Sequence, residues 1–204
     1  MTAASHTVVR LYCASANPKK VAEIARMLPD WVTFEPRPDG VPEPEETAPT
    51  LEGNAVIKAV EVANFTGQWA LADDTGLLVD ALDGEPGVRS ARFAGDAATD
   101  AENRALLLAR MRGVTNRSAR FRTVVALMHK SGEMHILRGE CEGTITETER
   151  GANGFGYDSV FVPADGDGRT FAEMDAAEKD AISHRARALR GLGPLVARIM
   201  GTSE

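Results

Sequence analysis

Two neighbouring carboxylates, Asp73 and Asp74, end an apolar run in the stretch LADDTG. Burying two charges side by side costs free energy unless a cation or strong hydrogen bonds compensate. Because neighbours on a strand point to opposite faces, one carboxylate can face a site while the other ties down a turn. The structural alternative is an Asx-turn before Gly76.

Further oxygen ligands lie in the acidic stretch PEPEET, which contains Glu43, Glu45 and Glu46. Such a loop is either solvated or able to join an aspartate around Mg²⁺, which prefers oxygen ligands. Asn54 and Lys58 follow it, lie one helical turn apart and therefore share a face.

A candidate phosphate site is the stretch SANPKK, which follows an apolar run and precedes residues with helical apolar spacing. Asn17 is placed as an N-cap and Pro18 as the first helical residue. A helix N-terminus presents unpaired N–H groups and partial positive charge. With Ser15, Lys19 and Lys20 beside it, this end suits a phosphate. The alternative is an ordinary capped helix with solvated lysines.

Two further stretches carry candidate binding residues. AEKDAISHRARAL places Lys179 just before a predicted helix, with His184 and Arg185 in its first turn. Cations there oppose the helix dipole, which a sequence tolerates more readily if an anion or a polar ligand binds at the same end. The alternative is a pair of surface side chains. Phe155 and Tyr157, in a glycine-rich loop, either stack on a base or simply pack.

The elements that must position these residues alternate between strands and helices. Strands are predicted over 7–14, 69–82 (interrupted by a turn at Thr75–Gly76), 121–129, 133–147 and the end of 151–163. Helices are predicted over 19–28 and 51–65, and a third follows a capping box at Thr99–Glu102. A fourth is predicted over 183–200, with Ser183 as its N-cap and a bend or interruption at Gly191 and Pro194. Residues 34–50 are predicted to form a loop rich in Pro and Glu. This order indicates an α/β fold with a mixed sheet.

Composition limits the classes of function. The 204 residues are 43% hydrophobic, and the formal charge of -7 argues against binding nucleic acid. Cys13 and Cys141 lack metal-ligand spacing and are expected to be reduced core residues. No P-loop is present. No apolar run is long enough to span a membrane and no signal peptide is evident, so we expect a soluble cytoplasmic protein without a membrane partner.

Taken in order, these stretches resemble the inosine triphosphate pyrophosphatase family. The resemblance runs from about Val8 to Leu192 and is carried by SANPKK, EETAPTLEGNAVIKA, ADDTGLLVDALDGEPGVRSARFAG, GFGYDSVF and EKDAISHRARAL. It implies an elongated α/β fold of two lobes, with a mixed central sheet flanked by helices and an active-site cleft between the lobes. Residues 7–204 would form one catalytic domain after a flexible extension at 1–6, and the protein would be a homodimer.

The resemblance also implies a set of site residues and a magnesium cofactor. Asp74 would be the proton acceptor and a metal ligand, and Glu46 the second metal ligand. The implied substrate-binding residues are Ser15, Ala16, Asn17, Pro18, Lys19, Lys20, Lys58, Thr75, Phe155, Gly156, Tyr157, Asp158, Lys179, His184 and Arg185.

The implied reaction converts ITP, dITP or XTP and water to the nucleoside monophosphate and pyrophosphate. A water molecule oriented by Asp74 would attack the α-phosphorus in line. Hypoxanthine and xanthine carry an acceptor oxygen at C6, which His184, Arg185 or backbone N–H groups could recognise. Two alternatives remain: a Maf-like pyrophosphatase for pyrimidine or modified nucleotides, which the stretches SHR and FGYD argue against, and a non-catalytic nucleotide sensor.

Overall fold

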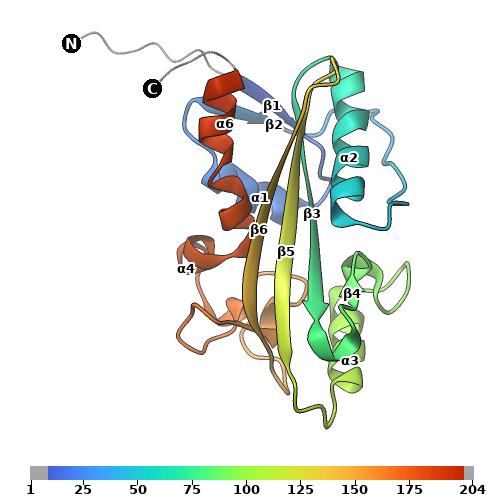
Figure 1. Ribbon diagram of the computed structural model, residues 1–204, viewed down its shortest axis with the longest axis vertical. Coiled ribbons are helices and arrows are strands. Elements are labelled where there is room, and N and C mark those ends of the chain that lie inside the picture. The colour runs from blue at the N-terminus through green and yellow to red at the C-terminus, as the bar shows by residue number, and fades with distance from the viewer. Residues whose placement is uncertain (1–8, 200–204) are drawn as a thin grey trace, which may run out of the picture. The chain divides into compact units, whose positions relative to one another are not determined.

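The computed structural model describes residues 9–199, in which helices and strands are mixed along the chain (Figure 1). The strands are β1 (Val9–Cys13), β2 (Val32–Glu35), β3 (Ala70–Val79), β4 (Pro86–Gly87), β5 (Ser118–Met128), β6 (Met134–Ile145) and β7 (Phe161–Pro163). The α-helices are α1 (Pro18–Met27), α2 (Leu51–Thr66), α3 (Asp100–Arg110), α4 (Ala176–Ile182), α5 (His184–Leu189) and α6 (Leu192–Ile199). The predicted extension at 1–6 lies outside the described residues.

The strands form one mixed sheet in the order β2-β1-β3-β5-β6-β7, with β4 paired to β3. β1 is parallel to β2 and β3, whereas β4 is antiparallel to β3 and β7 is antiparallel to β6. The predicted α/β class with a mixed sheet flanked by helices is therefore confirmed. The predicted elongated shape and cleft stay predictions.

Two compact units share this chain. The first contains residues 9–74, 124–138 and 188–199 of the described part, and the second contains residues 75–123 and 139–187. The chain of β3 therefore passes from the first unit to the second between Asp74 and Thr75. This junction falls inside the stretch in which the sequence concentrates its carboxylates.

The core of the first unit explains why its strands and helices form. Alternate residues of β1 are buried, and Leu11 packs in a cluster with Leu71 of β3 and Val125 of β5. Ile24 of α1 and Leu192 of α6 complete this cluster from the helices. Figure 1 shows α1 and α6 on one flank of these strands and α2 on the other. The apolar faces predicted from helical spacing are thus the ones that pack.

An aromatic core organises the second unit. The ring centroid of Phe121 lies 4.7 Å from that of Phe161 and 6.2 Å from that of Phe171. Helix α3 begins with the predicted capping box, in which the Thr99 and Glu102 side chains each bind the other residue's backbone N–H group. The buried residues of this unit therefore come from strands and from α3, a helix whose start the sequence predicted correctly.

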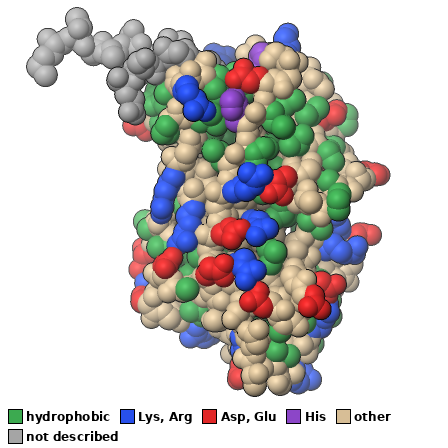
Figure 2. Space-filling model, viewed as in Figure 1, with side chains coloured by type: hydrophobic (Ala, Val, Ile, Leu, Met, Phe, Trp, Pro, Cys, Tyr) green, Lys and Arg blue, Asp and Glu red, His purple; other side chains and the backbone are tan. Residues whose placement is uncertain are grey.

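Charged side chains of both signs are interspersed on the face of the molecule shown in Figure 2. In the second unit, Arg120 Nε of β5 lies 3.0 Å from Glu142 Oε1 of β6. Arg122 Nε likewise lies 2.6 Å from Glu140 Oε1. Cross-strand pairs of this kind contribute little stability when they are exposed.

Three sequence predictions are wrong. Phe34 and Glu35 of β2 were expected to belong to a loop, but they pair in parallel with β1. No turn interrupts β3 at Thr75–Gly76, because the apolar residues on both sides are buried in the two cores. Lys179 lies inside α4 rather than before a helix, since Asp175 and Glu178 form a capping box that starts a separate helix.

The predicted C-terminal helix over 183–200 is interrupted, as its glycine suggested. Helix α5 ends at Leu189 and α6 begins at Leu192, so the break spans Gly191, whereas Pro194 lies within α6. The Ser183 hydroxyl accepts the Ala186 N–H at 3.2 Å, in agreement with its predicted capping role. Among the described helices, none combines the length and apolar character needed to cross a membrane.

Both cysteines should react slowly in the folded protein. Cys13 and Cys141 are fully buried free thiols, and burial raises the pKa of each to about 11. At pH 8 the folded protein should carry about a hundredfold less thiolate than the unfolded chain, whose cysteines have an ordinary pKa. We expect iodoacetamide to modify both thiols slowly under native conditions and rapidly in denaturant, as measured by intact mass. Equal rates in the two conditions would contradict their placement in the core.

Candidate functional site

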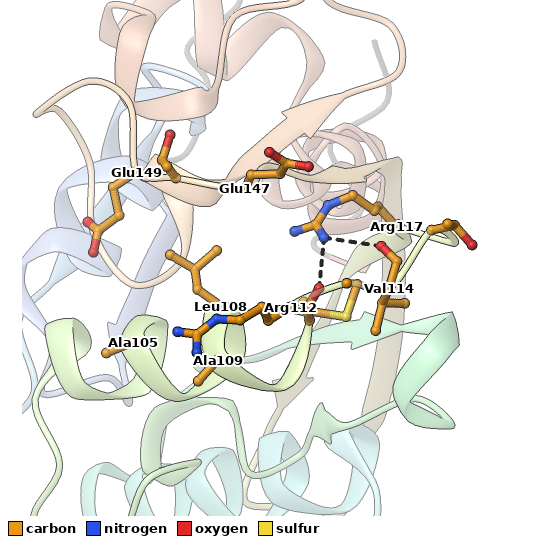
Figure 3. Close-up of a pocket in the computed structure, with 12 residues that line it drawn as sticks. Ala105, Leu108, Ala109, Arg112, Val114, Arg117, Glu147 and Glu149 are labelled. Atoms are coloured by element: carbon orange, nitrogen blue, oxygen red, sulfur yellow. Dashed lines mark hydrogen bonds between the residues drawn. The ribbon is translucent and has the colours of Figure 1, made fainter.

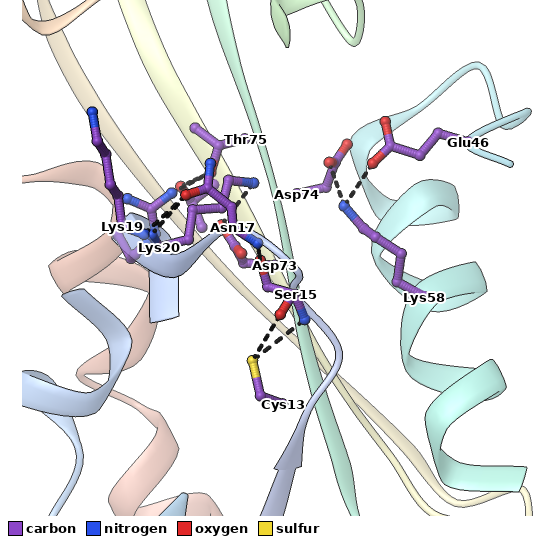
Figure 4. A network of polar contacts seen from close by, with 12 residues as sticks. Cys13, Ser15, Asn17, Lys19, Lys20, Glu46, Lys58, Asp73, Asp74 and Thr75 are labelled. Carbon is purple, nitrogen blue, oxygen red and sulfur yellow. Dashed lines mark hydrogen bonds and ion pairs between the residues drawn. The ribbon is translucent and has the colours of Figure 1, made fainter. Parts of the chain in front are cut away.

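The turn between β1 and α1 has the predicted local structure. The Asn17 side chain accepts the backbone N–H groups of Lys19 at 3.0 Å and Lys20 at 3.3 Å, and Pro18 is the first helical residue. The Ser15 hydroxyl accepts the Asn17 N–H at 3.2 Å. Figure 4 shows these side chains gathered at the start of α1. The turn is therefore held by its own side chains, with cations at its helical end.

A buried contact joins this turn to β3. The Lys20 Nζ lies 3.4 Å from Asp73 Oδ2, and the Asp73 side chain is fully buried. Its neighbour Asp74 pairs with a different lysine, Lys58. The two aspartates thus serve different partners, as strand alternation predicts. The Asx-turn alternative is wrong because both residues lie within the continuous strand β3.

The side chains of Glu46, Lys58 and Asp74 form the group that we call the carboxylate–lysine cluster. The Lys58 Nζ lies 2.7 Å from Asp74 Oδ1 and 3.0 Å from Glu46 Oε1. Figure 4 shows the ammonium pointing between the two carboxylates. The side chains of Lys58 and Asp74 are 12% and 8% exposed, so little water screens their interaction. Two carboxylates from separate segments converge here on one cation.

Helix α2 positions this cluster by holding the preceding loop at two points. Thr50 caps the helix by accepting the Gly53 N–H at 3.1 Å. One turn further, the buried Asn54 accepts the Ala48 N–H at 2.9 Å. Lys58 follows by another turn and reaches Glu46. The shared face of Asn54 and Lys58 that was expected from their spacing therefore fixes the acidic loop.

Burial dominates the electrostatics of the carboxylate–lysine cluster. It raises the pKa of Asp74, and the positive charges of Lys58 and Lys20 only partly oppose this effect. Burial also acts to lower the pKa of Lys58, but Asp74, Asp73 and Glu46 outweigh it, so the pKa of Lys58 is raised. Asp74 is therefore a stronger proton acceptor than an ordinary aspartate, and Lys58 remains a cation at neutral pH.

Removal of the central cation should destabilise the fold. Lys58→Met leaves Asp74 and Glu46 without their ammonium partner, so we expect the free energy of unfolding to fall by about 3 kcal/mol at pH 7. The loss should shrink at lower pH, because a protonated Asp74 no longer requires a cation. Urea denaturation measures both effects.

The matched control is Arg10→Met, which removes the 68% exposed partner of the 3.9 Å pair with Glu35. This substitution should cost less than about 1 kcal/mol. Equal losses in the two variants would show that the carboxylate–lysine cluster is not a buried ionic contact.

The second unit holds another group of the predicted residues, centred on Arg185. Arg185 is 1% exposed, and its guanidinium donates to the Thr75 hydroxyl at 3.1 Å. Thr75 Oγ1 lies 2.7 Å from Thr123 Oγ1. His184, 3% exposed, stacks on Phe121 with ring centroids 4.5 Å apart. His184 and Arg185 are therefore buried, and the surface alternative for them is wrong.

The loop 154–158 is built around one carboxylate. Asp158 Oδ2 accepts the Phe155 N–H at 2.9 Å and the Lys179 ammonium at 2.6 Å. The Lys179 Nζ also lies 5.1 Å from the centroid of the Phe155 ring, and the Arg185 guanidinium lies 5.8 Å from it. Phe155 is half-buried. This arrangement combines an aromatic face with nearby hydrogen-bond donors.

Tyr157 occupies the core beneath this loop. It is 4% exposed, and its hydroxyl donates to the Ser90 carbonyl at 2.9 Å. Burial raises the pKa of Tyr157 well above its ordinary value. Tyr157 thus fits the packing alternative, and Phe155 is the aromatic residue that remains for a base.

Substitution of Gly154 should disrupt the loop. Its φ of +74° is left-handed, and an added Cβ would lie 2.0 Å from Asp158 Oδ2. We expect Gly154→Ala to lower the free energy of unfolding by about 3 kcal/mol or more, because it adds a clash to backbone strain. Gly168→Ala is the control, since Gly168 also has positive φ (+92°) but open space around it. It should cost about 1–2 kcal/mol. Equal losses in denaturant titrations would refute the tight loop.

Several residues of these networks were not predicted from the sequence. Thr123 and Ser90 had no recognisable signal. Asp100 and Arg104 of α3 bind the Gly156 backbone, which helical spacing alone does not reveal. A cavity of about 900 Å³ in the second unit, with Leu108, Arg112 and Glu147 among its lining residues, contains none of the predicted site residues (Figure 3).

Comparison with known proteins identifies the family. The profile described as the Ham1 family matches residues 11–195. The chain belongs to the Ham1 family. A Deinococcus deserti protein named dITP/XTP pyrophosphatase is 50% identical over 184 residues, which cover 88% of this chain and 85% of that protein. An Exiguobacterium protein of the same name is 48% identical over 189 residues, covering 90% and 95% of the two chains.

A solved structure of a Ham1 protein from Coxiella burnetii supports the same assignment. It matches with a TM-score of 0.85 and 42% identity, covering 93% of this chain and 99% of the other. The resemblance drawn from the ordered sequence stretches is therefore confirmed. The carboxylate–lysine cluster and the loop 154–158 both lie within the part that matches the Ham1 profile.

Proposed function

We propose that this Ham1 protein hydrolyses the non-standard purine nucleotides ITP, dITP and XTP to the nucleoside monophosphate and pyrophosphate, and so cleanses the nucleotide pool. The observation that carries the proposal is the carboxylate–lysine cluster, in which Glu46 and Asp74 converge on one cation. The names of the relatives, dITP/XTP pyrophosphatase, support the reaction and its substrates.

Glu46 and Asp74 also fit a metal ion, in a family that is generally metal-dependent. Within residues 9–199, no three His, Cys, Asp or Glu side chains gather as a complete metal cage. Two carboxylates plus substrate phosphates and water suit Mg²⁺, which we propose as the cofactor. When bound, Mg²⁺ would neutralise phosphate charge and stabilise the leaving pyrophosphate.

The first unit would supply the phosphate chemistry. Ser15, Asn17 and Lys20 would bind the triphosphate at the start of α1, where N–H groups and the helix dipole favour anions. The neighbouring turn residues Ala16, Pro18 and Lys19 would line this site. Lys58 would add positive charge against the reacting phosphates.

Asp74 would act as the proton acceptor. Burial raises its pKa, so its carboxylate holds a proton more strongly than an ordinary aspartate does. It would orient a water molecule and take its proton during in-line attack on the α-phosphorus. The Lys58 ammonium 2.7 Å away favours the ionised form of this carboxylate and so partly offsets the effect of burial.

The second unit would recognise the base. Phe155 would stack on the purine, with Gly156, Tyr157 and Asp158 shaping the loop. Donors from Lys179, His184 or Arg185 would bind the oxygen at C6 of hypoxanthine or xanthine, while Thr75 orients Arg185. Adenine carries a donor at the same position and would leave these donors unpaired, which penalises its binding.

We also propose that residues 7–204 act as one catalytic domain, that the protein is a cytoplasmic homodimer, and that it has no nucleic-acid or membrane partner. The acidic net charge of -7 disfavours polyanions other than a small substrate held in a local basic site.

Pyrophosphate release from ITP, XTP, GTP, ATP and dTTP, each with Mg²⁺ and with a chelator, tests the proposal. We expect metal-dependent release from ITP and XTP, and a decrease of about 10²- to 10⁴-fold in Asp74→Asn, which lacks the proton acceptor. The control Asp80→Asn changes an exposed carboxylate that pairs with Arg120, and it should retain activity.

Two outcomes would contradict the proposal and favour one of the alternatives. Release from pyrimidine nucleotides alone would favour the Maf-like alternative. Binding of ITP without release from any nucleotide would identify a nucleotide sensor.

A further inference from the structure

Helix α3 holds the loop 154–158 from its outer side. The Gly156 N–H donates to Asp100 Oδ2 at 2.8 Å, and the Gly156 carbonyl accepts from Arg104 Nη1 at 2.8 Å. The N–H and the carbonyl of Gly156 are thus both bound by side chains that lie far away in the sequence. Hydrogen bonds that involve charged groups are stronger than neutral ones.

The positions of Asp100 and Arg104 follow from the start of α3. The capping box of Thr99 and Glu102 makes Asp100 the first helical residue. Arg104 comes four residues later and therefore lies on the same face of the helix. A well-capped helix thus presents a fixed pair of opposite charges, one for the N–H and one for the carbonyl of Gly156.

Two further hydrogen bonds connect α3 to residues outside the loop. Arg104 Nε donates to Glu149 Oε2 at 2.8 Å, and the same oxygen accepts from the Ser159 hydroxyl at 2.9 Å. The Arg104 side chain is only 18% exposed. The loop is therefore anchored at Gly156 and again just after its end at Ser159.

These contacts bear on base binding because the loop has two anchors of different kinds. Asp158 holds the loop from inside through Phe155 and Lys179. Asp100 and Arg104 hold Gly156, the residue that follows Phe155, from outside. If the outer anchor is lost, the orientation of the Phe155 ring is no longer fixed on both sides.

We infer that Asp100 and Arg104 are positioning residues that set the shape of the loop 154–158 and thereby the affinity for the purine base. This inference rests on the proposed function. Neither residue belongs to the carboxylate–lysine cluster, so their loss should raise KM for ITP and leave kcat nearly unchanged.

The test compares Asp100→Ala with Asp100→Asn. Both substitutions remove the charge at the start of α3, but asparagine keeps an oxygen that can accept the Gly156 N–H. We expect Asp100→Ala to raise KM for ITP by about 5- to 30-fold, as expected for the loss of a charged hydrogen bond, with kcat changed by less than about threefold. Asp100→Asn should restore KM to within about threefold of the original value.

Hydrogen–deuterium exchange of residues 154–158 gives a second readout that does not depend on activity. Exchange should be faster in Asp100→Ala and in Arg104→Met than in the unaltered protein. Arg110→Ala is the matched control, since Arg110 lies on the same helix but pairs with Glu85 and packs on Phe93. It should change neither KM nor exchange in the loop.

The outcomes separate the inference from the proposed function. If the unaltered protein releases no pyrophosphate, the proposed function fails, and exchange alone decides whether α3 positions the loop. If the unaltered protein is active but Asp100→Ala and Asp100→Asn behave alike, or loop exchange is unchanged, the inference is overturned. Should Asp100→Ala fail to fold, Arg104→Met, judged by the same KM and exchange criteria, decides the question.

Discussion

The contact of one ammonium with two carboxylates constrains much of the first unit. Lys58 extends from α2 and contacts Asp74 of β3 and Glu46 of the loop before α2. Carboxylates buried in this way require a cation, so the loop before α2 must close onto the helix and β3 must present Asp74 at that point. Under the proposed function, the same carboxylates would hold a metal ion and the neighbouring lysines would bind the phosphates.

Different interactions hold the candidate site residues of the two units. In the first, charge dominates, because lysines and carboxylates lie close together with little water between them. In the second, geometry dominates: Asp158 and the side chains of α3 hold backbone groups of a loop that has no sheet partner of its own. Under the proposed function, affinity for phosphate and selectivity for a base could therefore change independently, since they would depend on different residues.

Two of the errors in predicting the fold, those at β2 and β3, have a common cause, because contacts between distant segments decide both. Thr75–Gly76 has turn-like residues, yet the burial of Leu71, Leu77 and Val79 keeps β3 continuous. β2 contains few residues and gains its stability from pairing with β1, which no local signal reports. The prediction was correct where the structure depends on residues close together in the sequence, as at the Asn17 cap of α1.

The sequence by itself determined the class of fold, the caps at Asn17, Thr99 and Ser183, the family and the residue types of the candidate site. These features depend on spacing along the chain or on the order of short stretches. Only the tertiary structure decided that Lys20 pairs with Asp73 while Lys58 pairs with Asp74. It also decided that Asp100 meets Gly156, 56 residues away. Contacts of this kind arise when packing brings distant segments together, so their energies appear in no local pattern.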